Sequence, residues 1–390
     1  MSSKKTINPP QSLKHMVTRT YLGTSGWHYQ DWVGPVYSKE EAEQEWLPYY
    51  SRIFNFVNIN MTYYKEKVPQ ELVRRWYGQT PPNFKFVVKA NQKFTHKQSF
   101  NPQKFSQWIK QFQDLQEKQL GFLLQFPQSV VRSKQLLSAI KQIQSESIVF
   151  VEFRNRSWYY PPPETDPAVL VIPDTPTIST LPGRATSIRS TNQDIIFVRL
   201  HGRNRFRWYE HREARERYDY YYPPIEIKYL IQKMASSKSL IIIDANNHPL
   251  GQAPLNIIDT KRAMGEKLSE SEKKLERRIT SVLGHRLQRE KMGELNAYYP
   301  RTEESDWNTA LRTDLSARIR VATPYVIAGT SEGVEVYIDR CEKRIFCEKT
   351  SHRGTLCEHL RALLKETGEE NPHVILEDYK DIMGIMGTKL

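Results

Sequence analysis

Residues 147–158 read SIVFVEFRNRSW, a short run of β-branched and aromatic residues that becomes polar at Glu152. Uninterrupted apolar runs of this length are typical of parallel strands that are covered on both faces. Seven similar runs occur along the chain: TYLGTS (20–25), FNFVNIN (54–60), FKFVVKA (84–90), LGFLLQF (120–126), VLVIPD (169–174), IIFVRLH (195–201) and LIIIDA (240–245). The number and spacing of these runs decide the fold.

Helical patterns lie between several of the runs. Apolar residues recur three and four positions apart in PQELVRRWYG (69–78), FSQWIKQFQDLQ (105–116) and SKQLLSAIKQIQ (133–144). Eight strands with intervening helices over roughly 245 residues predict an α/β fold, a TIM-like (β/α)8 barrel. An open doubly wound sheet is the competing layout, but no glycine-rich phosphate turn follows an early strand.

The length of 390 residues exceeds what one compact core usually organises, so more than one domain is expected. The composition predicts a disordered basic tail (1–18), the barrel (19–265), a helical linker (266–306) and a small α+β module (307–390). No apolar run approaches the roughly 18 to 20 residues that cross a bilayer, and the first residues lack the apolar stretch of a secretory signal. We therefore expect no membrane association. All three cysteines fall between positions 341 and 357, which favours a reducing compartment, the cytoplasm.

The net charge of +13 favours a polyanionic partner, because basic side chains release counterions from phosphate backbones. The segment RNRFRWYEHREARER (203–217) adds six arginines with three aromatic residues between them. Guanidinium groups and aromatic faces together suit phosphates and unstacked bases. The alternative is a helix whose glutamates pair with these arginines at three and four spacing. The sequence predicts nucleic acid as a partner and leaves DNA and RNA open.

In barrels of this type the reactive groups lie at the carboxyl ends of the strands. Residues there that can move a proton or hold a cation are the catalytic candidates: Glu152, Asp174, His201 and Lys89. Other polar and aromatic residues at or just beyond the strand ends are the substrate-binding candidates: Trp27, Tyr29, Trp32, Asn60, Tyr64, His96, Gln125, Arg154, Trp158, Arg199, Arg203, Tyr220, Asn246 and Asn247. Ser25, Asn58 and Asp244 also end strands. Such a rim suits an anionic substrate, and a divalent metal in the barrel is the cofactor we expect.

Several of these blocks resemble, in order, those of the domain-of-unknown-function 72 (YecE-like) family: GTSGWHYQDW (23–32), FVNINMTYY (56–64), FKFVVKANQKFTH (84–96), LLQFP (123–127), VEFRNRSW (151–158), VRLHGRN (198–204) and NNHPLGQAPLN (246–256). The resemblance implies a TIM-like barrel similar to those of endonuclease IV and xylose isomerase, without a settled reaction. The family usually has a glutamate where this chain has Asn58, which weakens any metal scheme that depends on that carboxylate.

The residues near the carboxyl end resemble the SWIM zinc-binding module. Cys347, Cys357 and His359 match its pattern, but the second cysteine of its first pair is missing, and Cys341 or His352 could complete a tetrahedral site. The zinc ligands we predict are therefore Cys341, Cys347, Cys357 and His359. In the alternative, the module has lost its metal and the thiols pack as small buried groups. The resemblance implies a role in recruiting DNA or a protein partner.

Three functional hypotheses follow. The first is a metal-assisted phosphodiester hydrolase that acts on nucleic acid at the barrel mouth, with the zinc-binding module recruiting the substrate. The second is a non-catalytic DNA- or RNA-binding adaptor. The third is an isomerase or lyase that acts on a small sugar-like metabolite, whose ring would stack on Trp27, Trp32 and Trp158.

Overall fold

The computed structural model of the chain describes residues 20–96, 100–192, 194–234, 240–289, 313–349, 357–367 and 380–381. The predicted tail and residues 290–306 of the predicted linker lie outside these ranges. No helix in the described part of the chain is both long enough and apolar enough to cross a membrane.

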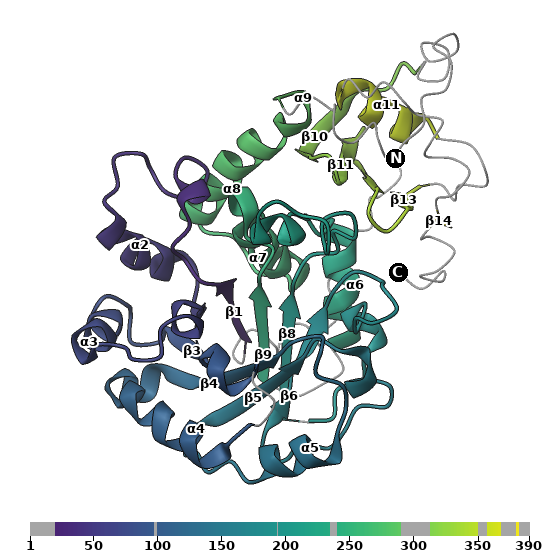
Figure 1. Cartoon of the computed structure of the whole chain (residues 1–390). Helices are drawn as coiled ribbons and strands as arrows, with labels where there is room; N and C mark the ends of the chain where they lie inside the picture. The colour runs from purple at the N-terminus through teal and green to yellow at the C-terminus, as the bar shows by residue number, and fades with distance from the viewer. Residues whose placement is uncertain are drawn as a thin grey trace.

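A parallel sheet of nine strands confirms the predicted TIM-like α/β barrel (Figure 1). Its strands are β1 (Thr20–Ser25), β2 (Phe56–Ile59), β3 (Lys85–Lys89), β4 (Gln119–Phe126), β5 (Ile148–Phe153), β6 (Val169–Leu170), β7 (Ile172–Asp174), β8 (Ile195–Leu200) and β9 (Leu240–Ala245). Each of the eight apolar runs contains a strand, and the sixth run is divided into β6 and β7.

The division of the sixth run closes the sheet. The strand order is β6-β5-β4-β3-β2-β1-β9-β8-β7, so its two end strands are separated in the chain by Val171 alone. Strand β6 pairs with β5 and β7 pairs with β8, while the amide of Val171 donates to the carbonyl of Val151. Residues 169–174 thus pair first with β5 and then with β8, and this closes the sheet into a barrel.

Helices flank the sheet along most of its length (Figure 1). They are α2 (Trp46–Ile53), α3 (Gln70–Gly78), α4 (Pro102–Trp108), α5 (Lys134–Lys141), α6 (Pro224–Met234) and α7 (Gln252–Ala263). Between β7 and β8 the described residues form only a single 3-10 turn, at Ala185–Ser187.

The barrel interior is built in layers because successive strand residues point to opposite faces. One buried apolar cluster collects a residue from each of seven strands together with Val171: Phe56, Val87, Leu123, Phe150, Val169, Val171, Phe197 and Ile242. Two positions later on six of these strands the residues are Asn58, Lys89, Gln125, Glu152, Arg199 and Asp244. The period of two therefore places a polar layer directly above the apolar one.

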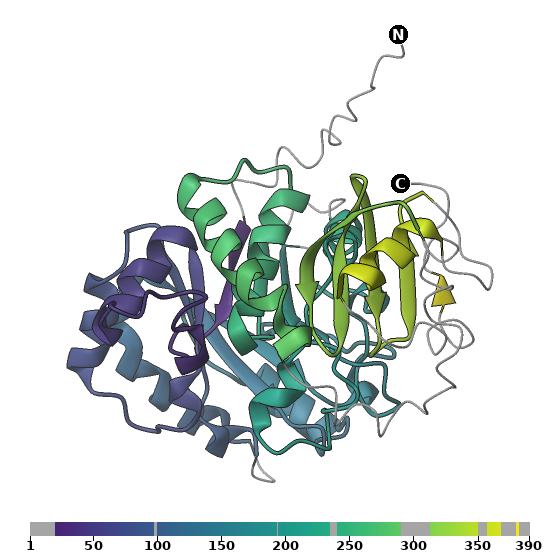
Figure 2. The ribbon, with the colours of Figure 1, turned by 90° about the horizontal axis from the view of Figure 1, so that it is seen from above.

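The C-terminal region forms a second sheet beside the barrel (Figure 2). Helices α8 (Glu270–Leu283) and α9 (Arg286–Arg289) lead to strands β10 (Ala317–Ala322), β11 (Val326–Ser331), β12 (Val334–Asp339) and β13 (Arg344–Cys347), helix α11 (Glu358–Thr367) and strand β14 (Lys380–Asp381). Strands β10 to β13 are antiparallel neighbours in chain order. A sheet with a helix is what the small α+β module predicted after the barrel requires, although the sequence analysis did not identify β10 and β11.

Candidate active site at the barrel mouth

Seven side chains from neighbouring strands meet at the carboxyl end of the sheet. Register pairs Ser25 with Asn58, Gln125 with Glu152, and Arg199 with Asp244. Lys89 ends β3, between the strands of Asn58 and Gln125. We call these seven residues the polar layer: Ser25, Asn58, Lys89, Gln125, Glu152, Arg199 and Asp244.

Arg199 lies at the centre of the polar layer and is fully buried. Its Nε donates to Asp244 Oδ2 at 2.7 Å, and its Nη1 donates to Glu152 Oε2 at 2.6 Å and to Gln125 Oε1 at 3.0 Å. Its Nη2 donates to Ser25 Oγ at 2.7 Å. One guanidinium therefore connects four other strands and neutralises much of the charge on two carboxylates.

Asp244 has no free oxygen for a metal ion. Ser25 Oγ lies 2.7 and 2.8 Å from its two carboxylate oxygens, and Asn58 Nδ2 donates to Oδ2 at 2.8 Å. The amide of Asn58 donates a hydrogen bond here, whereas a glutamate at this position would bring a second negative charge against Asp244.

Glu152 is held as a carboxylate by three neighbours. Arg154 and Arg199 form ion pairs with it, and His201 Nε2 lies 2.9 Å from Oε1. Burial alone would raise the pKa of Glu152, but these positive charges and the hydrogen bond to His201 outweigh burial and lower it well below the usual value. Burial, with Arg154 beside it, lowers the pKa of His201 well below the usual value. Glu152 is thus charged and His201 neutral at pH 7.

Lys89 differs from the other cations of the polar layer. Its ammonium lies 4.3 Å from the centroid of the Tyr63 ring, and among the described residues it has no hydrogen-bond acceptor or ion-pair partner. Burial, together with the positive charges of Arg199 and Arg154, lowers the pKa of Lys89 to about 7. A substantial fraction of Lys89 is therefore an uncharged amine at neutral pH, the form that acts as a base or nucleophile.

Other predicted residues surround this group. Tyr63 Oη lies 3.0 Å from His96 Nε2, and burial together with Lys89 lowers the pKa of His96. Arg154 Nη2 donates to Gln125 at 3.2 Å and lies 3.1 Å from His201 Nδ1. Asn246 Nδ2 lies 3.0 Å from the same nitrogen. The half-buried Asn60 leaves Oδ1 without a hydrogen-bond partner.

The aromatic residues chosen from the sequence divide into two groups. Trp32 and Trp158 are fully buried: the indole of Trp32 donates to the carbonyl of His248, and Trp158 stacks on Phe153 with ring centroids 3.8 Å apart. Neither presents a face to a substrate, so their predicted role as stacking walls is not supported. Trp27 and Tyr29 are half-buried, and Tyr64 is 75% exposed.

The candidate site residues chosen from the sequence did not include Tyr218, which belongs to the tyrosine cluster after the arginine-rich segment, or His248. Tyr29 stacks on His248 with ring centroids 4.3 Å apart, and Tyr218 lies 5.7 Å from His248 and 6.4 Å from His201. Burial lowers the pKa of His248 to about 3, and its Nδ1 has no hydrogen-bond partner. The position of His248 was the available signal. It lies two residues beyond Asn246, just after the end of β9, where polar residues on other strands were chosen as candidates.

Asp174, Arg203 and Tyr220 belong to a different network. Arg203 Nε and Nη2 donate to the two oxygens of Asp174 at 2.7 and 2.9 Å, and Tyr222 and the amide of Ala185 complete its contacts. Tyr220 donates to Asp339 of β12 at 2.6 Å. All three side chains are buried and fully engaged, so the catalytic role predicted for Asp174 and the substrate-binding roles predicted for Arg203 and Tyr220 are not supported. Asn247 is likewise buried and donates to Tyr220 and Asn256.

The arginine-rich segment after β8 forms only a short 3-10 helix, Ala214–Tyr218, in place of the longer helix weighed from the sequence. Glu213 and Glu216 form a capping box, and Arg215 pairs with Glu213 at 2.6 Å. Tyr209, by contrast, is 56% exposed, and Arg205 and Arg212 lie at the surface. Ion pairs thus account for part of the segment, while other arginines face solvent.

The predicted zinc ligands do not all come together. Cys347, Cys357 and His359 offer ligand atoms within 4.8 Å of one another, and His359 Nδ1 is buried without a hydrogen-bond partner. Cys341 is buried at the other end of β13, where its thiol lies 3.7 Å from Asn204 Oδ1, so it is not part of this group. His352 lies outside the described residues.

No second group of this kind occurs in the described part of the chain, the barrel mouth included. The carboxylates of Glu152, Asp174 and Asp244 face arginines instead of one another. This arrangement does not support the divalent metal predicted in the barrel.

Known proteins were compared with the chain and with its fold. Residues 21–279 match the family described as a protein of unknown function, DUF72. The UPF0759 protein YunF of Bacillus subtilis (strain 168) is 28% identical over 258 residues, which cover 58% of this chain and 88% of that protein. The match to the family ends at residue 279, within α8, so the residues that resemble the SWIM module lie outside it.

Two solved structures share the fold. A DUF72 family protein of Thermotoga maritima is 29% identical with a TM-score of 0.54, and covers 63% of this chain and 99% of its own. A DUF72 family protein of Enterococcus faecalis is 23% identical with a TM-score of 0.52, and covers 64% of this chain and 97% of its own. The sequence match over two thirds of the chain shows that this protein belongs to the DUF72 family, whose function is unknown.

Proposed function

We propose that the barrel mouth is the active site of an enzyme that acts on an anionic substrate, and that Lys89 is its proton-accepting residue. The observation that carries this proposal is the Lys89 amine, which lies at the end of a barrel strand with a pKa of about 7 and no acceptor among the described residues. Bases with a pKa near the working pH are the most effective in proton transfer.

The charges at the mouth favour an anion. Lys89, Arg154 and Arg199 contribute positive charge, Glu152 and Asp244 contribute negative charge, and His201 is neutral. With Lys89 protonated, this set carries one net positive charge. A phosphate beside the protonated form of Lys89 would gain a cation that no protein carboxylate already neutralises, whereas the uncharged form, which is also populated near pH 7, is the one that would act as the base.

Nucleic acid is the substrate class that we propose. The net charge of +13 and the exposed arginines after β8 support it. In phosphodiester hydrolysis, the uncharged amine of Lys89 would accept a proton from the attacking water as its oxygen bonds to phosphorus. The bond from phosphorus to the leaving oxygen breaks, and that oxygen takes a proton from solvent. This scheme replaces the metal assistance expected from the sequence.

A gel assay with labelled single- and double-stranded DNA and RNA tests the proposal. We expect cleavage that persists in chelator and falls at least about 100-fold in Lys89→Met, the loss typical of a missing general base. Lys104→Met is the matched control, because Lys104 is exposed on α4. Cleavage that needs a divalent metal and survives Lys89→Met would contradict the mechanism. Retarded but uncleaved substrate would indicate the non-catalytic adaptor instead.

Lys89 also supports a second candidate function. An uncharged lysine amine adds to a carbonyl carbon and, with loss of water, forms an imine. An isomerase or lyase for a small carbonyl metabolite would use Lys89 in this way. Borohydride reduction in the presence of glycolaldehyde, followed by peptide mass analysis, separates the two candidates: selective modification of Lys89 favours the metabolite enzyme.

We propose in addition that Cys347, Cys357 and His359 bind zinc. The three ligand atoms lie close together, and the unpartnered Nδ1 of His359 would gain a partner. A bound zinc ion would stabilise the C-terminal sheet, which could then recruit nucleic acid or a protein.

Metal analysis of the dialysed protein tests the zinc site. We expect one zinc per chain in the wild type and in Cys341→Ala, and loss of zinc in Cys357→Ser. A wild type without zinc, or loss of zinc only in Cys341→Ala, would overturn this assignment.

A further inference from the structure

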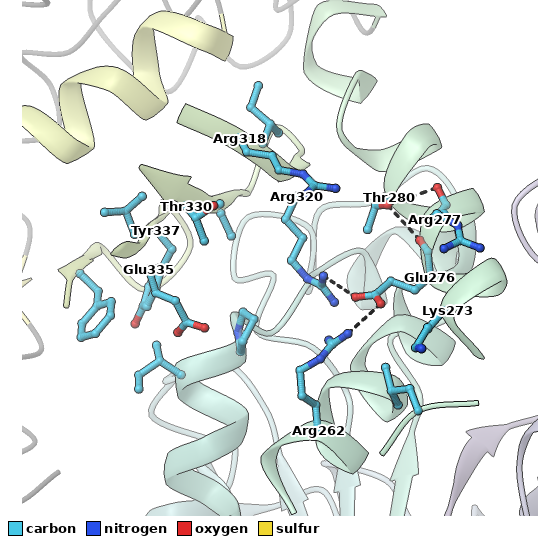
Figure 3. A pocket seen from close by; sticks show the side chains of 18 of the residues that line it. Arg262, Lys273, Glu276, Arg277, Thr280, Arg318, Arg320, Thr330, Glu335 and Tyr337 are labelled. Atoms are coloured by element: carbon cyan, nitrogen blue, oxygen red, sulfur yellow. Dashed lines mark hydrogen bonds and ion pairs between the residues drawn. The ribbon is translucent and has the colours of Figure 1, made fainter. Parts of the chain in front are cut away.

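A cavity of about 630 Å³ lies between the barrel and the C-terminal sheet. Helices α7 and α8 form one wall, and strands β10 to β12 form the other (Figure 3). Its size is within the range of roughly 300 to 1,000 Å³ that small-molecule sites occupy. We propose that this junction cavity binds a small phosphate-bearing ligand, independently of the reaction at the barrel mouth.

The side chains that line the cavity include more cations than carboxylates, but Lys273 and Arg320 are paired with Glu270 and Asp259, which do not line it. The cations are Arg262, Lys273, Arg277, Arg318 and Arg320, and the carboxylates are Glu266, Glu276 and Glu335. Residues from both the barrel and the C-terminal sheet contribute cations. An anion in the cavity would therefore contact both units at once.

Two of the arginines are already fixed. Arg320 Nη1 donates to Glu276 Oε1 at 2.6 Å, and Arg262 Nη2 donates to Glu276 Oε2 at 2.7 Å. Arg320 also pairs with Asp259, whose side chain is 1% exposed. Figure 3 shows Arg262 and Arg320 converging on Glu276 from opposite sides. These ion pairs hold the two walls in place and leave little charge for a ligand.

The other two arginines are free to bind. The guanidinium groups of Arg277 and Arg318 make no hydrogen bond or ion pair with another described residue, and both residues are exposed at the cavity. Arg318 extends from β10 toward α8, where Thr280 and Arg277 lie (Figure 3). Two guanidinium groups on facing walls suit a phosphate, which accepts paired hydrogen bonds from each.

The opposite end of the cavity has a different chemistry. Burial, with Glu348 nearby, raises the pKa of Glu335, and Thr330 lies on the adjacent strand. A hydroxyl or amino group of the ligand would find an acceptor there. Apolar side chains such as Leu268 and Phe346 line the space between the charged residues. The arrangement fits a phosphorylated small molecule that carries hydrogen-bond donors away from its phosphate.

Titration calorimetry of the full chain with inorganic pyrophosphate at constant ionic strength tests this proposal. We expect saturable binding in the wild type, weakened at least about tenfold in Arg277→Ala/Arg318→Ala, since each charged hydrogen bond contributes to affinity. The control Arg52→Ala/Arg75→Ala removes two exposed arginines elsewhere and should bind as the wild type does. Thermal unfolding checks that each variant is folded, and pyrophosphate should raise the unfolding temperature of the wild type.

Three results would overturn the proposal: no binding to the wild type, equal binding by the cavity variant and the wild type, or binding lost only in Lys89→Met. The last would place the anion at the barrel mouth and leave the proposed enzyme function standing. An oligonucleotide that binds through Arg277 and Arg318 where pyrophosphate does not would likewise contradict a small-molecule site.

Discussion

In the polar layer, Glu152 is held in its charged form, whereas the neutral form of Lys89 is favoured, and Arg154 and Arg199 contribute to both effects. Glu152 lies against the guanidinium groups of Arg154 and Arg199, which keep it charged in spite of burial. Lys89 lies near the same two arginines without a directly paired carboxylate, so burial and repulsion favour its neutral form. The arginines thus determine both the fixed anion and the available amine.

Replacing Glu152 with glutamine tests the role of this carboxylate in stability. The change leaves Arg154 and Arg199 buried with one counterion fewer, and we expect a loss of about 3 to 5 kcal/mol in urea unfolding at pH 7. Because folding lowers the pKa of Glu152, its contribution is full above the unfolded value of about 4.3 and is lost as pH falls through the folded value. The wild type and the variant should therefore converge in acid.

The exposed Glu164 provides the control, and Glu164→Gln should leave stability unchanged at both pH values. Equal stability of Glu152→Gln and the wild type at pH 7 would show that the ion pairs do not hold the mouth together.

The position rule for strand ends explains why much of the mouth was predictable. Glu152 lies at the end of β5, and Arg199 and His201 lie at the end of β8, and the structure brings all three together across the barrel mouth. The contrast with Asp174 was not predictable, since its partners Arg203 and Tyr222 follow it by 29 and 48 positions. A strand end shows where a residue lies along the barrel axis but not whether its charge is already neutralised.

At the scale of elements, helix α8 is the part of the chain that joins the two units. Its N-terminus is fixed by a capping box, in which Ser269 Oγ accepts from the amide of Glu272 and the Glu272 side chain accepts from the amide of Ser269. Its buried face, which includes Leu275 and Ile279, packs into the main core. The opposite side lines the junction cavity.

Removing the N-cap hydroxyl of α8 should lower the stability of the folded protein. We expect Ser269→Ala to lower the free energy of unfolding by about 1 kcal/mol, the usual effect of losing an N-cap hydroxyl. Ser271→Ala, at an exposed position inside the same helix, should cost much less. Urea denaturation measures the free energy of unfolding of both variants. Equal losses in Ser269→Ala and Ser271→Ala would show that the N-cap hydrogen bond does not stabilise the protein.

The sequence predicted the presence of this helix more accurately than its first and last residues. The sequence predicted a helical linker over 266–306, and in the part of it that the structure describes α8 ends at Leu283 and α9 begins at Arg286. Strand β10 was missed because the runs chosen from the sequence were continuously apolar, whereas ARIRVA (317–322) alternates charged and apolar residues. Such alternation is the pattern of a strand with one face exposed.

At the scale of the whole molecule, Glu226 links the barrel to the C-terminal sheet. It accepts from Arg184 and Arg203 at 3.0 and 3.1 Å on the barrel side, and from Tyr337 of β12 at 3.1 Å. The positive charges around it outweigh burial and lower its pKa. Arg344 of β13 lies 3.5 Å from the same carboxylate, so Glu226 on α6 neutralises cations of both units.

Glu226→Gln should uncouple the two units. The change leaves buried arginines without their counterion, and we expect a loss of about 3 to 5 kcal/mol together with a broader or two-step thermal transition. Glu71→Gln, at an exposed position in α3, should unfold in one step like the wild type. A single unshifted transition in Glu226→Gln would mean that the other contacts between the units, such as Tyr220 to Asp339 and Arg320 to Asp259, join them without Glu226.

The ionisation of Lys89 is the most direct test of an active site at the barrel mouth, and it needs no knowledge of the substrate. Competitive acetylation over pH 5 to 11, read by peptide mass analysis, measures the pKa of each lysine amine in the folded chain. We predict a midpoint near 7 for Lys89, well below the value of about 10.4 for lysine in model peptides. A Lys89 midpoint near that ordinary value would contradict the proposed base.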